Sequence, residues 1–321
     1  MSLWDLVSQN LGSPAVLAFV LGAVAVRLKS DLSFPEAITS LLSTYLLLGI
    51  GLKGGLRLRD AAIDDLFLPL VATLLLGVLT PAVTYVVARK FLSRSPADCA
   101  ALAAHYGSVS AVTFTAAETF VRNAGTLDEN YLAALVAVLE VPGIIVALVI
   151  ASRVLGKSRL RTAVHEVVTG RSVVLLIGGL IIGFVASEKS AALVEPLFVD
   201  MFAGVLVLFL LDLGVLAGAR FGAIRAAGSK LIIFGVGLPV LFGVLGAVLG
   251  TAAGLSIGGV TVMATMAASA SYIAAPAAVR VGMPDADAGF ALGAALGITF
   301  PFNLVIGIPL YAELASRLSS S

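Results

Sequence analysis

The feature that most constrains this chain is a run of 49 residues, 231–279, without a single charged side chain. A bilayer-spanning helix needs about 20 mostly apolar residues, so this run is too long for one helix and long enough for two. It has a natural break at Gly254–Gly259, where glycines and a serine interrupt the apolar sequence. Splitting it there, together with the other apolar runs, predicts ten transmembrane helices. The other runs cover residues 6–26, 38–52, 66–88, 99–117, 130–152, 172–187, 190–219 and 288–312.

The composition excludes a water-soluble protein. Charged residues make up 12% of the chain and hydrophobic residues 60%, whereas about a quarter of the residues of a soluble domain are charged. The net charge is +1 without a basic tract, so no nucleic-acid partner is expected. The apolar runs are continuous rather than alternating, which predicts helices and not the strands of an outer-membrane barrel. The sequence therefore predicts an all-α polytopic membrane protein within a lipid bilayer.

No motif for enzymatic chemistry is present. The sequence contains no nucleophile elbow, no zinc-protease motif, no nucleotide-binding lysine loop and no Cys/His cluster, and Cys99 is its single cysteine. We therefore expect no enzyme, no cofactor and no resident metal. Without a nucleotide-binding loop, an ion gradient is the natural energy source.

The basic residues predict an orientation. With ten spans, 14 of the 20 lysines and arginines fall on one side of the membrane and 6 on the other. The positive-inside rule places the side with more basic residues in the cytoplasm. The protein is therefore expected to lie in the inner (plasma) membrane with both termini on the outer side. No Lys or Arg precedes Arg27, so the first span is expected to be retained rather than cleaved as a signal peptide. Its leader, Ser2–Leu11, is expected to be an interfacial helix anchored by Trp4.

The two halves of the chain resemble each other at a common offset. Residues 46–55 resemble 209–218 at an offset of 163, and residues 108–110 resemble 269–271 at an offset of 161. Five spans per half is an odd number, so the halves are expected to be inverted relative to each other, as in many transporters. The alternative is chance similarity between Gly- and Leu-rich helices. We expect two five-helix repeats, residues 1–160 and 161–321, within one membrane domain.

Two predicted spans carry small and polar residues in the middle of apolar sequence, at residues 105–113 and 268–276. Gly107 and Pro276 favour non-helical backbone there. An unwound backbone is tolerated in a membrane only where it is buried in protein or lines a cavity. Each second half-helix would begin with free N–H groups and about half a positive charge, so two of them form an anion site without arginine. The alternative is a purely structural role, in which the small residues only permit close helix packing. The predicted substrate-binding residues are Gly107, Ser108, Ser110, Thr113, Ser269, Ser271 and Tyr272.

Ionisable residues inside the predicted spans are candidates for cation coupling, because a charge at mid-membrane is costly. Glu140 and Asp212 are such residues, and Ser269 adds an oxygen ligand to this coupling set. His105, beside the first interruption, is expected to be packed and neutral. The Gly-x-x-x-Gly pairs are expected to be helix-packing seams. These pairs are Gly51/Gly55, Gly179/Gly183, Gly214/Gly218 and Gly293/Gly297.

Several motifs resemble those of the cyanobacterial sodium-dependent bicarbonate permease family. They lie at residues 267–276, 280–287 and 307–310 of the second half and at residues 107–113 and 140–142 of the first half. The resemblance extends over essentially the whole chain. It implies ten helices in two inverted five-helix repeats with two broken crossing helices, related to the sodium/proton antiporter and bile-acid symporter folds. It also implies a homotrimer, bicarbonate as substrate and Na+ as the driving ion.

The resemblance also assigns roles to residues. Ser110 and Ser271 match serines of the family's anion site, Ser269 matches another serine of the second motif, and Glu140 matches an acidic residue that is usually aspartate.

The chain departs from the family pattern in its second motif. Ala270 replaces a serine, Tyr272 replaces an aspartate, and Ala274–Ala275 replace Ser-Gly. The long cytoplasmic loop of the cyanobacterial members is missing, so regulation by a PII-like partner is not carried over.

The leading hypothesis is a secondary active transporter of a small anion, with Na+-coupled bicarbonate uptake by alternating access as its specific form. One alternative keeps the fold and changes the substrate, as an organic-anion:sodium symporter or a cation/proton antiporter. The other alternative is a membrane sensor or scaffold that does not transport.

Overall fold

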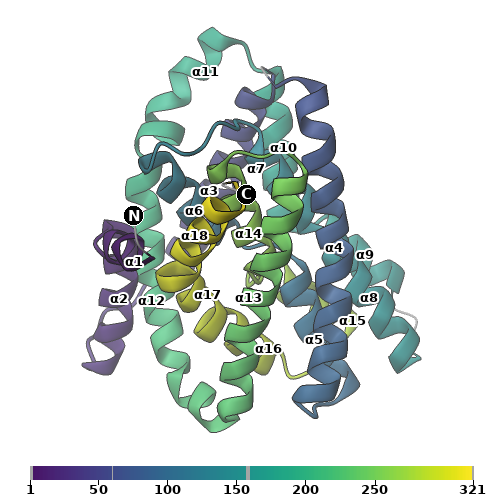
Figure 1. Ribbon diagram of the computed structural model, residues 1–321. Coiled ribbons are helices and arrows are strands. Elements are labelled where there is room, and N and C mark those ends of the chain that lie inside the picture. Colours follow the sequence, from purple (N-terminus) through teal and green to yellow (C-terminus); the bar gives the residue numbers. More distant parts are fainter. Residues whose placement is uncertain (1–2, 60, 157–159, 320–321) are drawn as a thin grey trace.

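The computed structural model describes residues 3–59, 61–156 and 160–319, and every regular element within these ranges is a helix. The prediction of an all-helical membrane-type protein is thereby confirmed. The long helices run along the length of the bundle, and shorter helices lie between them (Figure 1).

The first half of the chain begins with a short helix and contains two pairs of short helices in sequence. Its helices are α1 (Leu3–Leu11), α2 (Pro14–Arg27), α3 (Glu36–Leu58), α4 (Ile63–Phe91), α5 (Pro96–Gly107), α6 (Ala111–Asn123), α7 (Leu132–Glu140) and α8 (Pro142–Leu155).

The second half follows a similar order. Its helices are α9 (Leu160–Val168), α10 (Arg171–Val185), α11 (Glu188–Glu195), α12 (Phe202–Ala227), α13 (Ser229–Ala252), α14 (Ile257–Ala268), α15 (Ala275–Gly282), α16 (Ala288–Ala294), the single turn α17 (Phe300–Phe302) and α18 (Ile308–Ser319). Three π-helical turns connect some of them: η1 (Pro196–Asp200), η2 (Ala295–Thr299) and η3 (Asn303–Gly307).

Among the described residues, six helical segments are long and apolar enough to cross a membrane, or up to eight if each of two bent pairs forms one span. The bent pairs are α1–α2, with an angle of 69°, and α9–α10, with an angle of 44°. The interrupted pairs α5–α6 and α14–α15 are not among these eight.

The leader helix predicted at the start of the chain is present as α1 (Leu3–Leu11), and the uncharged run 6–26 is shared between α1 and α2. The hydroxyl of Ser13 accepts a hydrogen bond from the N–H of Val16, and Pro14 begins α2, so α1 and α2 are separate helices. Trp4 in α1 is 75% exposed, as an interfacial anchor requires. The predicted boundary between the halves, at residues 160 and 161, lies beside residues 157–159. Those residues include Lys157 and Arg159, two of the basic residues used for orientation, and lie outside the described residues.

Helices α3 and α10 pack backbone against backbone along their glycines. A Cβ built on Gly55 would overlap the carbonyl oxygen of Leu180, and one built on Gly183 would overlap that of Leu52. Small residues at such positions let helices approach closely within a membrane. This seam joins a helix of the first half to a helix of the second half.

Helices α2 and α12 form a second seam of the same kind. A Cβ on Gly22 would overlap the carbonyl oxygen of Leu211, and one on Gly214 would overlap that of Phe19. The predicted glycine seams are therefore confirmed on α3, α10 and α12. The prediction is wrong at Gly293, where an added Cβ would meet nothing within 4 Å.

Candidate functional site

The predicted fourth span is interrupted between Gly107, where α5 ends, and Ala111, where α6 begins. Ser110 has extended backbone, with φ −94° and ψ 111°. Its hydroxyl oxygen accepts hydrogen bonds from the backbone N–H of Thr113 at 3.2 Å and from the Thr113 hydroxyl at 2.9 Å. Ser110 is thus the N-cap of α6, where a serine oxygen satisfies one of the free amides of the first turn.

The predicted ninth span is interrupted between α14 and α15 in a comparable way. The hydroxyl oxygen of Ser271 accepts hydrogen bonds from the N–H groups of Ala274, at 3.3 Å, and Ala275, at 3.4 Å. Pro276 lies in the first turn of α15, where its missing N–H removes no helical hydrogen bond. Ser271 therefore stabilises the start of α15 as Ser110 stabilises the start of α6.

The two interruptions are in direct contact. The N–H of Ser110 donates to the hydroxyl oxygen of Ser269 at 2.9 Å, and the N–H of Ser271 donates to the carbonyl oxygen of His105 at 2.7 Å. The imidazole Nδ1 of His105 lies 2.6 Å from the carbonyl oxygen of Ser271. Because a carbonyl oxygen only accepts, this nitrogen carries the proton. All four residues are at most 4% exposed, so the starts of α6 and α15 are held together inside the protein.

The start of α6 keeps unused hydrogen-bond donors. Ser110 and Thr113 have partners, but within the described residues the N–H groups of Ala111 and Val112 have none. Both residues border an apolar gap, too narrow for a water molecule, between α3, α6, α12 and the second interruption. Ser43 of α3 also lines it, and its buried hydroxyl has no hydrogen-bond partner. Free amides at a helix N-terminus favour anions, but this gap has no room for an anion in this structure.

Two of the predicted substrate-binding residues contact a different part of the molecule. The hydroxyl of Ser108 donates to the backbone carbonyl oxygen of Glu140 at 3.0 Å, and the backbone of Gly107 lies against Gly143, where an added Cβ would overlap it. Gly107 and Ser108 thus join α5 to the span formed by α7 and α8. The structure brings the other serines, Ser110, Ser269 and Ser271, together at the contact between the interruptions.

The remaining candidates differ in their surroundings. The buried hydroxyl of Tyr272 interacts with the side chain of Ser110, and its ring meets that of Phe300 edge to face at 5.4 Å. The carboxyl of Glu140 is 3% exposed and is hydrogen-bonded to the side chain of Ser172, while its Oε2 has no partner. The carboxylate of Asp212 accepts a hydrogen bond from the Thr39 hydroxyl at 2.7 Å. Its hydrogen bond therefore goes to α3 and not to either interruption.

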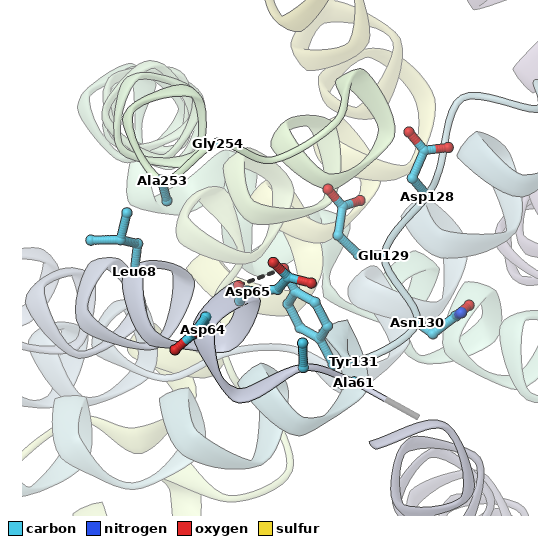
Figure 2. Close-up of a pocket in the computed structure, with 11 residues that line it drawn as sticks. Ala61, Asp64, Asp65, Leu68, Asp128, Glu129, Asn130, Tyr131, Ala253 and Gly254 are labelled. Atoms are coloured by element: carbon cyan, nitrogen blue, oxygen red, sulfur yellow. Dashed lines mark hydrogen bonds between the residues drawn. The ribbon is translucent and has the colours of Figure 1, made fainter. Parts of the chain in front are cut away.

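A second cavity, of about 500 Å³, lies where α4 begins and α13 ends (Figure 2). Asp64, Asp65, Asp128 and Glu129 line it, and the hydroxyl of Tyr131 donates to the backbone carbonyl of Asp65 at 3.0 Å. Burial and the carboxylates of Glu129 and Asp65 raise the pKa of Tyr131 to about 12. This negative surrounding disfavours an anion, so the cavity is not the candidate site for one.

Comparison with known families places the chain in a transporter superfamily. A family model described as the Na+-dependent bicarbonate transporter superfamily matches residues 14–316, nearly the whole chain. The chain belongs to this superfamily. A comparison with curated proteins gave no match. Membership of a transporter family implies a protein that is not an enzyme, and its apolar helices indicate a membrane protein.

A buried polar residue beside the second interruption was not singled out by the sequence argument. The side-chain amide of Asn303 donates to the carbonyl oxygen of Ala268, the last residue of α14, at 2.8 Å, and its Oδ1 accepts from the Tyr311 hydroxyl at 3.2 Å. Asn303 is fully buried. An isolated amide within the apolar run 288–312 was the available signal, because a buried polar side chain requires a partner.

Proposed function

We propose that this protein is a secondary active transporter that takes up bicarbonate by alternating access, with Na+ as the coupling ion. The observation that supports this most directly is the contact between the starts of α6 and α15, where Ser110 bonds to Ser269 and Ser271 bonds to His105. Such a contact places two helix N-termini against one buried location. Helix N-termini stabilise anions through their free amides and their dipoles.

The hydrogen-bond directions separate the serines into two kinds. The hydroxyl of Ser271 acts only as an acceptor in its bonds to Ala274 and Ala275, so it keeps a proton that can be donated to an anion. The hydroxyl of Ser110 accepts from Thr113 and otherwise interacts with the Tyr272 hydroxyl, so an anion would take the place of Tyr272 as the partner of its proton. The hydroxyls of Ser108 and Ser269 donate to carbonyl oxygens, so their protons are in use. We therefore assign direct contact with the anion to Ser110 and Ser271. Ser269 acts by holding the two interruptions together.

In alternating access by inverted repeats, the two halves adopt equivalent conformations in turn, so that the site opens to one side of the membrane and then to the other. The packing of the glycine seams is consistent with two such repeats. Helix α3 of the first half packs on α10 of the second, and α12 of the second half packs on α2 of the first. This exchange of partners is expected for two inverted repeats. Counting α5–α6 and α14–α15 as two further spans gives ten, which places both termini on the same side of the membrane, outside the cell by the positive-inside rule.

Coupling to Na+ is assigned to the surroundings of Glu140. Its unpartnered Oε2 is a hard oxygen ligand of the type that Na+ prefers. Tyr272 stands where the resembling family carries an aspartate, so that second motif offers no carboxylate for a cation. A sodium site in this chain would therefore rely on Glu140 and on backbone carbonyl oxygens.

The test is uptake of labelled bicarbonate into proteoliposomes that contain the purified protein, with and without an inward Na+ gradient. The proposal predicts uptake that the gradient accelerates. Absence of uptake in both conditions would overturn it. Uptake of a carboxylic acid in place of bicarbonate would identify an organic-anion symporter, proton release in exchange for cations would identify an antiporter, and anion binding without flux would indicate a sensor.

A further inference from the structure

A group of basic side chains lies outside the proposed transport site, where α3 adjoins α6. Arg57 of α3 and Arg122 of α6 bind the same carboxylate oxygen, Oε1 of Glu118, at 2.9 and 2.8 Å. The Nε of Arg122 donates to that atom as well, at 2.9 Å. Lys53 adds a third cation, which interacts electrostatically with Glu118 while its Nζ lies 3.3 Å from the centre of the Phe202 ring. We call Lys53, Arg57 and Arg122 the basic cluster.

The basic cluster carries more charge than Glu118 can neutralise. Three cations surround one carboxylate, so two positive charges remain uncompensated by it. The side chains of Arg57 and Arg122 are 32% and 33% exposed, whereas that of Glu118 is 10% exposed. The carboxylate is thus enclosed while both arginine side chains remain partly exposed. A salt bridge that only joined α3 to α6 would need a single cation.

The group that the basic cluster already binds indicates what else it can bind. A carboxylate is a planar monoanion whose oxygens accept guanidinium hydrogen bonds, and guanidinium groups match that geometry. Bicarbonate has the same charge and a planar arrangement of oxygens. We propose that the basic cluster is a second anion site, which takes a planar monovalent oxyanion and which Glu118 occupies in part.

The position of the basic cluster gives this site a role in transport. Glu118 lies seven residues beyond the first residue of α6, which corresponds to about 10 Å along a helix. An anion held there lies along the same half-helix whose N-terminus belongs to the transport site. The basic cluster would therefore collect the substrate anion and raise its local concentration, as clefts of one charge sign do. That the anion is bicarbonate rests on the function proposed above.

The two variants that separate an anion site from a simple salt bridge are Glu118→Gln and Arg57→Gln. If Glu118 competes with the anion, Glu118→Gln tightens binding, roughly fivefold or more, while Arg57→Gln weakens it by a similar factor. A salt bridge without an anion site predicts that both variants lose thermal stability and that neither changes anion binding. Lys53→Met removes one charge without breaking the ion pairs and should also weaken binding. Arg317→Gln, in the Glu313–Arg317 pair of α18, is the matched control.

The first measurement uses nitrate, a planar monovalent oxyanion, as the probe. The midpoint of thermal unfolding of the purified protein is followed against nitrate concentration at constant ionic strength, which gives an apparent affinity for each variant. Opposite changes in Glu118→Gln and Arg57→Gln support the site. Unchanged nitrate affinity in Glu118→Gln, Arg57→Gln and Lys53→Met overturns it. The nitrate response should persist in Ser110→Ala, since that residue belongs to the inner site.

The second measurement is bicarbonate uptake by the same variants in proteoliposomes. Arg57→Gln should raise KM roughly fivefold or more and leave kcat within about twofold, with a smaller effect at high salt because the charges are partly exposed. A fall of kcat with unchanged KM would contradict a capture site. If the wild-type protein shows no uptake at all, the proposed function fails, and the nitrate measurement still decides whether the basic cluster binds anions.

Discussion

Replacing Ser110 by alanine removes one oxygen and one proton with separate consequences. The oxygen caps α6 by accepting hydrogen bonds from Thr113, and the hydroxyl proton is the one that we assign to the transported anion. Loss of an N-cap costs about 0.5–2 kcal/mol of stability. Loss of a hydrogen bond to a charged group costs about 1.5–3 kcal/mol. The second value corresponds to an affinity for the anion that is roughly 10- to 100-fold lower.

The assay is initial bicarbonate uptake over a range of substrate concentrations, together with thermal unfolding of the same preparation. We expect Ser110→Ala to unfold at a moderately lower temperature and to show a KM at least several-fold higher. Ser271→Ala should behave alike, because its hydroxyl has the same bonding pattern at the start of α15.

Ser95→Ala is the matched control. Ser95 caps α5 by accepting a hydrogen bond from the N–H of Asp98 at 3.1 Å, at the far end of the helix from the interruption. It should lose stability by a similar amount and keep its KM. If Ser110→Ala and Ser271→Ala both keep the wild-type KM, the assignment of the anion to the two N-caps is incorrect.

Three further substitutions test other parts of the structure. Glu140→Gln should weaken or abolish the dependence of uptake on Na+, because it removes the charged oxygen ligand; identical Na+ curves would exclude this role. Gly143→Ala should lower stability by about 3 kcal/mol or more in thermal unfolding, because its Cβ would overlap the Gly107 carbonyl oxygen and a backbone cannot move aside. Gly178→Ala, where nothing lies within 4 Å, is its control and should be near neutral. His105→Leu should reduce uptake severalfold in kcat, because the second interruption loses its imidazole donor; wild-type kinetics would show that this bond is dispensable.

The helices and their interruptions were predictable because they depend on local chemistry. Continuous apolar sequence predicts spanning helices, and residues such as Gly107 and Pro276 disfavour helical backbone wherever they occur. The span limits were less predictable. Helix α3 continues beyond Lys53 through Leu58, because the ammonium group packs on the Phe202 ring and Arg57 pairs with Glu118. Such contacts join residues that are far apart in the sequence, so the local sequence does not predict them.

The partners within the site were largely beyond sequence reasoning. His105 was expected to be a packed, neutral residue, and the structure adds that its imidazole and its carbonyl both bind Ser271. Asn303 lies 35 residues from the carbonyl that it binds at Ala268. A repeat offset identifies which segments correspond to each other, but it does not specify which atoms meet. Ser269 illustrates this limit, because only coordinates show that its oxygen accepts the Ser110 N–H.

The close backbone contacts of α3 with α10 and of α2 with α12 restrict how this molecule can change shape. With no side chains between the helices, a relative shift would drive one backbone into the carbonyl groups of the other. Each seam joins opposite halves of the chain, so swinging the halves apart would disrupt both seams at once. The four helices are therefore expected to stay fixed as a frame. The interrupted helices, which the Ser110–Ser269 and His105–Ser271 bonds hold together, would then move past that frame as a single body and carry the bound anion with them.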